Sequence, residues 1–227
     1  MIKKTFWTCA LAASLLFTGV TQAQQFEAVH AVNFESTNRA KAAMDSLFED
    51  DAMKGARVTL YVSQFGAPPA SHLVVADFDD YDDYMERNEK RRASHGWARY
   101  MLGTADSEYI GSSLEMVVDD HGKPRHTAGY LVAFLIHTTD AAAYRAALAD
   151  MNESIGNPGV LRLVATRSGN LAATHAVLVG GKDFAAVNEY LDTLYASEAF
   201  KEFVAKVGAT RKVVGIDMYR RVATWGD

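Results

Sequence analysis

The chain has 227 residues, of which 49% are hydrophobic, and a formal net charge of −5. This excess of acidic residues disfavours nucleic acids and anionic membrane surfaces as partners. The single cysteine, Cys9, lies within the first 23 residues, so a chain cleaved after Ala23 has no disulfide, no thiolate nucleophile and no cysteine-bound metal.

Residues 1–23 predict a secretory signal peptide. Lys3 and Lys4 form a basic start, an apolar stretch follows up to Val20, and Thr21-Gln22-Ala23 reads as a cleavage site with small end residues. The apolar stretch is short for a membrane span, which needs about 20 residues. We therefore expect cleavage near Ala23/Gln24, export to the periplasm or out of the cell, and no membrane partner.

The first repeat, residues 24–118, has a hydrophobic pattern that predicts the element order βαββαβ. Gly66-Ala67-Pro68-Pro69 separates its two middle strands, because these residues cannot continue a ladder. Asp80 is predicted to cap the second helix. The strands are expected at 27–34, 57–65, 72–78 and 108–118, and the helices at 37–52 and 82–102.

The second repeat, residues 129–227, shows the same order after a polar stretch at 119–128 that reads as a linker. Asp140 and Asp183 are predicted to cap its two helices, the second of which should cover about 184–206. The strands are expected at 130–137, 159–166, 175–179 and 212–222.

The two halves can be aligned without a gap. Residues 56–101 match 159–204 at a constant offset of 103, with nine identical pairs in 46 positions. His72 corresponds to His175, and Trp97 to Phe200. This internal match predicts a tandem duplication of a ferredoxin-like βαββαβ unit.

Two features carry a resemblance to a known family. Strands such as 73–78 are apolar on both faces, so their sheet needs a cover on each side. The second helix of each half holds a Ser-x-x-aromatic sequence, at Ser94–Trp97 and Ser197–Phe200. With the βαββαβ order, this resembles the dimeric α+β barrel superfamily, most closely its antibiotic-biosynthesis-monooxygenase-like branch.

The resemblance implies an α+β fold in which two ferredoxin-like repeats pack sheet to sheet as a single-chain pseudo-dimeric α+β barrel. Such a chain is expected to be a monomer, or at most a weak homodimer. The superfamily includes cofactor-free oxygenases, haem-degrading enzymes, cyclases and isomerases, so the fold alone does not decide the function.

Polar residues in the middle of strands are the catalytic candidates, since a buried charge must be paired. Arg162 would anchor a carboxylate or enolate, and Asp217, His137 or Glu115 would move a proton. Arg162 stands where the first half has Thr59, so the halves differ where an interior would be lined. The alternative is a purely structural Arg–Asp pair, Arg162 with Asp217, in the interior or at a sheet edge, together with exposed residues on edge strands.

The ligand-binding candidates are Asn33, Tyr61, His72, His175, His95 and Trp97. His72 and His175 open corresponding strands and, if both faced the interior, would form a symmetric pair for an acidic ligand. Two histidines are too few for a metal site, so we expect no metal. The alternative is a polar residue at a strand start, hydrogen-bonded near its hairpin.

Residues 91–97 form a basic patch that includes His95, where the second half is apolar and acidic. Haem-degrading relatives carry an asparagine on the first strand and a histidine and a tryptophan on this helix. Asn33 matches the asparagine, but the expected position of the haem-binding histidine holds Met101. We therefore expect no cofactor, and a protein-interaction surface at this patch is a further possibility.

We expect an exported small-molecule-binding or accessory protein, with an interior pocket between the two repeats and a small organic molecule as its partner. The alternative is a cofactor-independent enzyme of the oxygenase, cyclase or isomerase type, acting on an aromatic or polyketide-like molecule.

Overall fold

The computed structural model describes residues 25–169 and 173–226, so the signal peptide expected at 1–23 lies outside the described residues. None of the described helices has the length and apolar character to cross a membrane. The first half contains β1 (Phe26–Asn33), α1 (Thr37–Phe48), a 3-10 turn (Asp51–Met53), β2 (Arg57–Phe65), β3 (His72–Phe78), α2 (Tyr81–Arg92), α3 (His95–Gly103) and β4 (Glu108–Gly122). The second half contains a 3-10 turn (Arg125–Thr127), β5 (Tyr130–Thr138), α4 (Ala141–Ile155), β6 (Val160–Ser168), β7 (His175–Gly181), α5 (Phe184–Ala196), α6 (Glu198–Val207) and β8 (Arg211–Trp225).

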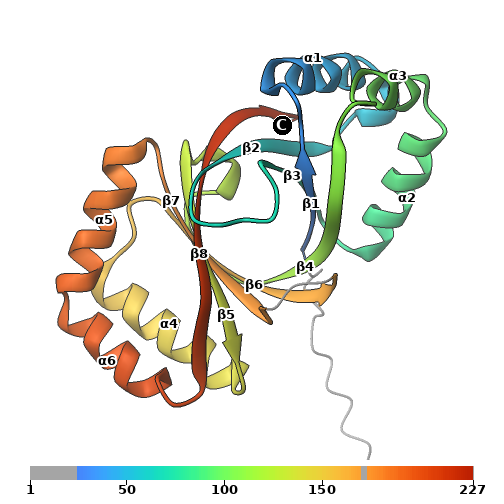
Figure 1. The fold of residues 1–227 in the computed structure, drawn as a ribbon. Helices are drawn as coiled ribbons and strands as arrows, with labels where there is room; N and C mark the ends of the chain where they lie inside the picture. The colour runs from blue at the N-terminus through green and yellow to red at the C-terminus, as the bar shows by residue number, and fades with distance from the viewer. Residues whose placement is uncertain (1–24, 170–172, 227) are drawn as a thin grey trace, which may run out of the picture.

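The eight described strands close into an antiparallel barrel, in the order β1-β3-β2-β8-β5-β7-β6-β4. Helices α1 to α3 lie outside the sheet of the first half, and α4 to α6 lie outside that of the second (Figure 1). Both halves arrange their strands alike, as β4-β1-β3-β2 and β8-β5-β7-β6. The expected α+β barrel, with helices on one face of the sheet and the opposite sheet on the other, is confirmed.

The single long helix expected near the end of each half is in fact two helices. Between α2 and α3 the side chain of Ser94 accepts a hydrogen bond from the Trp97 N–H at 3.0 Å. Ser197 accepts one from the Phe200 N–H at 3.1 Å between α5 and α6. The Ser-x-x-aromatic sequence is therefore an N-cap, at which one helix ends and the next begins.

Strand β4 continues to Gly122, beyond the end that its hydrophobic pattern predicted at Val118. The added residues pair with β6, where Asp120 lies opposite Arg162. Beyond β4, the 3-10 turn directs Arg125 into the barrel, where it is 1% exposed. The polar stretch expected as a linker is thus part strand and part buried turn, because its charged residues find partners inside the barrel.

The helix layers of the two halves are packed differently. In the second half, α4 and α5 each bury four residues against the sheet, and α6 buries Phe203 and Val207. In the first half α1 also buries four residues, but α2 buries none and α3 buries only Gly96. The second helix pair of the first half therefore buries fewer residues against its sheet than that of the second half does.

Candidate functional site

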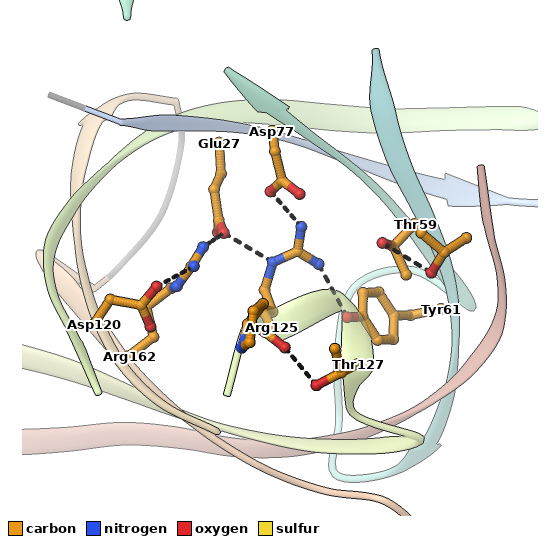
Figure 2. Close-up of polar contacts among 10 residues, drawn as sticks. Glu27, Thr59, Tyr61, Asp77, Asp120, Arg125, Thr127 and Arg162 are labelled. Atoms are coloured by element: carbon orange, nitrogen blue, oxygen red, sulfur yellow. Dashed lines mark hydrogen bonds and ion pairs between the residues drawn. The ribbon is translucent and has the colours of Figure 1, made fainter. Parts of the chain in front are cut away.

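The barrel interior contains a network of ion pairs centred on Arg125 (Figure 2). Its Nε donates to Glu27 Oε1 at 2.8 Å, and its Nη2 donates to Asp77 Oδ1 at 2.5 Å. Its Nη1 donates to the Tyr61 hydroxyl at 3.0 Å. Because Arg125 and Glu27 are each 1% exposed, these contacts replace the water that both charges lose on folding.

Arg162 lies in the same network. Its guanidinium is bonded to Glu27 and to Asp120, so Glu27 is shared between two arginines. Burial alone would raise the pKa of Glu27, but the Arg125 and Arg162 charges outweigh it and lower that pKa. Arg162 is thus occupied by carboxylates of the chain itself, and these are Glu27 and Asp120 rather than Asp217.

Two further catalytic candidates, Glu115 and Asp217, are also buried. Glu115 accepts a hydrogen bond from Ser113 at 3.0 Å, and burial together with the nearby Glu27 charge raises its pKa to about 7. Asp217 accepts the Ala67 N–H at 3.1 Å, and burial raises its pKa. Neither carboxylate is bonded to Arg162, so the predicted catalytic set is not brought together.

The remaining histidine candidates lie in separate places. His72 is buried, and its Nε2 and Nδ1 lie 2.8 Å from the hydroxyls of Thr37 and Ser71. His175 contacts Thr174 of its own half at 2.9 Å, while His137 is exposed on β5. Burial lowers the pKa of both His72 and His175. Each histidine therefore forms hydrogen bonds at the start of its own strand, and His72 and His175 do not contact each other.

Asn33 and His95 also lie away from any common site. The Asn33 side chain donates to Glu108 at 2.9 Å and accepts the Ser71 N–H at 2.8 Å, which fixes the end of β1. His95 is exposed at the start of α3. Among the described residues, no group of three or more histidine, aspartate or glutamate side chains is placed to hold a metal ion.

A cavity of about 470 Å³ lies between the sheet of the first half and its helices, outside the barrel. The sequence predicted a pocket between the two halves, but this cavity belongs to the first half alone. Alternate residues of β1 and β3 form its floor, since successive side chains of a strand face opposite sides. The floor includes Ala28, His30, Val32, Val74, Ala76 and Phe78, and the walls include Tyr84, Asn88, Arg91, Trp97 and Tyr100.

The inner face of α2, which covers the cavity, is polar. Tyr84, Arg87, Asn88 and Arg91 are spaced as one face of a helix, and all four line the cavity. At the matching positions, 103 residues later, α5 carries Val187, Tyr190, Leu191 and Leu194. All four of these are buried in the core of the second half.

The floor of the cavity differs from the second half in the same way. His30 pairs with Val74 across β1 and β3, and Phe134 pairs with Val177 across β5 and β7. Phe134 therefore occupies the position of His30 and packs against the second-half core. On both the strand floor and the α2 wall, the first half thus carries polar residues where the second half carries apolar ones.

The polar groups of the cavity have unusual electrostatics. Burial, followed by the charge of Arg91, lowers the pKa of His30 to about 4, so its imidazole is neutral at pH 7. The Arg91 guanidinium lies 4.0 Å from the centre of the Trp97 ring and donates to Asn88 Oδ1 at 2.8 Å. The basic patch predicted around Arg91 is therefore partly a cavity wall.

Comparison with known proteins reveals similarity of structure only. No protein-family model matches the sequence, and no curated protein is similar to it in sequence. A candidate monooxygenase from Fusobacterium nucleatum has a TM-score of 0.60 at 10% identity, over 90% of this chain and 95% of that one. An anthrone oxidase-like protein has a TM-score of 0.56 at 13% identity, over 90% and 93%. A haem-binding protein from Thermus thermophilus has a TM-score of 0.51 at 10% identity, over 88% and 92%.

The chain has the dimeric α+β barrel fold. At these identities the similarity establishes the fold and leaves the chemistry to the residues of the site.

The cavity residues of this dimeric α+β barrel do not match the haem site of the haem-degrading relatives. Met101 lines the cavity at the position where those relatives carry a histidine. Asn33, the other residue of the match, is not part of the lining and is bonded elsewhere. The residues of the chain therefore do not fit that haem site.

Of the site residues predicted from the sequence, Trp97 lines the cavity and the others do not. His30, Tyr84 and Asn88 were missed, and Arg91 was noticed only as part of a surface patch. A usable signal was present in the internal alignment, because Tyr84 and Asn88 correspond to Val187 and Leu191. A polar replacement on the inner face of a helix indicates that this face does not pack.

Proposed function

We propose that the protein binds a small, largely apolar organic molecule in the first-half cavity. The observation that carries this proposal is the polar inner face of α2 over a cavity of about 470 Å³, where the second half has packed core. An unfilled cavity of this kind lowers stability. The second half fills the corresponding space with core side chains. A ligand that binds in the first-half cavity is the best explanation for the difference.

The composition of the lining supports the proposal. Ligand pockets are typically about 300–1,000 Å³ in volume and mostly apolar, with a few polar groups that orient the ligand. Here the apolar surface comes from aliphatic, methionine and aromatic side chains of β1, β3, α1 and α3. His30, Asn88 and Ser112 supply polar atoms at separate points of the lining.

The proposal can be tested by native mass spectrometry of the protein purified from its own organism. We expect an added mass that is lost on denaturation. A variant with Asn88→Leu and Arg91→Leu, the residues that α5 carries, should fold but lose the added mass. Lys90→Gln, on the exposed face of α2, is the matched control and should retain it. A wild-type protein without added mass that also fails to bind aromatic compounds would contradict the proposal.

A second candidate function is that of a cofactor-independent enzyme, and His30 favours it. Its imidazole is unprotonated at pH 7 and can accept a proton from an acidic carbon or hydroxyl, while the nearby Arg91 guanidinium stabilises the anion. A pKa of about 4 makes His30 a weak base, so the expected acceleration is modest. The similarity to an anthrone oxidase-like protein suggests anthrone as a probe, which reacts with dioxygen to give anthraquinone and water.

Oxygen uptake with anthrone measures this activity directly. We expect the wild-type protein to accelerate uptake and His30→Gln to lose most of the acceleration while retaining ligand binding. Equal rates for wild type, His30→Gln and buffer alone would exclude this oxidation and leave binding as the function.

We further propose that the two halves descend from one duplicated ferredoxin-like unit. Their shared strand order and the offset of 103 between β2 and β6, β3 and β7, and β4 and β8 support this.

We also propose that the mature protein starts near Gln24 and is exported. The basic and apolar pattern of residues 1–23 supports export, and N-terminal sequencing of the protein from the periplasmic fraction tests it.

A further inference from the structure

We propose that the ligand of the first-half cavity is an aromatic carboxylate, with its ring between the aromatic walls and its carboxylate on Arg91. This inference rests on the proposed binding function and adds the chemical class of the ligand. It follows from the charge of the lining, the hydrogen bonds of Arg91 and the arrangement of the aromatic residues.

Arg91 is a half-buried cation without an anionic partner among the described residues. Its hydrogen bond goes to the neutral amide of Asn88, and its guanidinium lies over the ring of Trp97. The charged or titratable groups that act on it are Arg92, Tyr100 and Tyr84, none of which is a carboxylate. Burial is the main cause that lowers the pKa of Arg91, so its charge is incompletely compensated.

The lining as a whole is positive in a protein with a net charge of −5. It includes Arg57, Arg87, Arg91 and Arg92 but one acidic residue, Asp77. The Asp77 carboxylate is bonded to Arg125, and Arg87 is paired with Asp83. The field inside the cavity therefore favours an anion.

The geometry of Arg91 favours a carboxylate. A guanidinium has five N–H donors in a planar fork that matches the two oxygens of a carboxylate. Nη2 of Arg91 is bonded to Asn88, while Nε and Nη1 make no hydrogen bond to another described residue and can donate to a ligand. His30 is neutral at pH 7 and can share a hydrogen bond without adding a second charge.

The aromatic walls favour a flat hydrocarbon body rather than a phosphate or a sugar. Trp97 and Tyr100 are stacked, with ring centres 5.1 Å apart and an angle of 24° between the planes. Phe78 and Tyr84 meet edge to face at 5.1 Å on another side of the lining. Flat aromatic rings pack well against such surfaces.

Calorimetric titration with 2-naphthoate and 2-naphthamide tests the inference, because the two compounds share a ring and differ in charge. We expect the wild-type protein to bind the naphthoate more tightly. Arg91→Gln should weaken naphthoate binding about tenfold or more and change naphthamide binding by less than about threefold. Arg91→Lys should fall between them, since lysine keeps the charge but lacks the fork. Lys90→Gln should bind as wild type does.

The outcomes separate this inference from the binding function on which it rests. If the amide binds as tightly as the acid, or if Arg91→Gln weakens both equally, the cavity binds a ligand but the carboxylate assignment is wrong. If neither compound binds the wild-type protein, both the assignment and the proposed function fail for this ligand class. Retained amide binding in Arg91→Gln also shows that this variant is folded.

Discussion

The helix layers of the two halves differ in one respect that decides where a ligand can bind. Helix α5 buries Val187, Leu191 and Leu194 against its sheet, while α2 presents polar residues at the same positions over a cavity of about 470 Å³. The strands beneath both helices pair in the same order. The difference teaches that one strand order can carry either a packed core or a cavity, according to the residues on the helix face and on the strand floor.

The barrel interior shows no such difference between the halves, because residues of both halves contribute to one shared network of ion pairs. Glu27 and Asp77 come from the first half, Arg162 comes from the second, and Arg125 comes from the 3-10 turn between β4 and β5. The interior therefore holds the halves together, while the helix layers are free to differ.

The largest expected effect concerns this shared interior. Arg125→Met leaves Glu27 buried with one of its two partners removed, so we expect the free energy of unfolding to fall by about 3–5 kcal/mol. Denaturant titration measures the change. Arg145→Met, which removes an exposed ion pair with Asp119, is the control and should cost less than about 1 kcal/mol. Equal effects of the two variants would show that the interior does not hold the halves together.

The next effect sharpens the contrast between the helix layers. Leu191→Ala removes a core side chain of α5 and should lower the free energy of unfolding by about 2–5 kcal/mol. Asn88→Ala, at the matching position of α2, should cost less than about 1 kcal/mol because Asn88 faces the cavity. Thermal unfolding of the pair checks this. Similar costs at both positions would mean that α2 packs as α5 does.

A smaller effect concerns the pH dependence of the free energy of unfolding, to which the buried Glu115 contributes. The pKa of Glu115 is raised from 4.5 to about 7, so the folded state binds its proton more tightly than the unfolded state does. The resulting stabilisation is complete below about pH 4.5 and is lost as the pH rises through 7, which amounts to about 2–3 kcal/mol between pH 5 and pH 8. Glu115→Gln should remove this part of the pH dependence. An unchanged pH profile of unfolding in that variant would show that Glu115 titrates normally.

The smallest expected effect is a gain. Asn88→Leu introduces the side chain that α5 carries and should raise the free energy of unfolding by about 1 kcal/mol, because it fills part of the cavity with apolar atoms. Lys90→Leu adds the same side chain on the exposed face and should give no gain. Destabilisation by Asn88→Leu would indicate that the space under α2 cannot accept it.

Much of the fold could be predicted from the sequence. The strand periodicity placed β2 and β3 correctly, and the internal offset of 103 also relates β4 to β8. The break between α2 and α3 was missed, since Ser94 was taken as an internal helical residue whereas its side chain caps the second helix. A capping serine within an otherwise continuous helical pattern is a local signal that outweighs the periodicity.

The sites were harder to predict. Arg125 lies in a polar stretch with a glycine and a proline, and only its tertiary partners explain why it is buried. His30 lies in a strand whose alternation indicates two faces, but the sequence does not say which face meets a cavity. The cavity depends on how far α2 lies from the sheet, which is a result of packing across the whole half.

The most direct test of the account is an NMR titration of the 15N-labelled protein with 2-naphthoate, followed through the amide and indole signals. The account predicts shifts confined to β1, β3, α2 and α3, with the indole of Trp97 among the largest, and no shifts in β5, α5 or α6. Shifts centred on the second half or on the exposed pair Phe65 and Phe184, or no shifts at all, would contradict it.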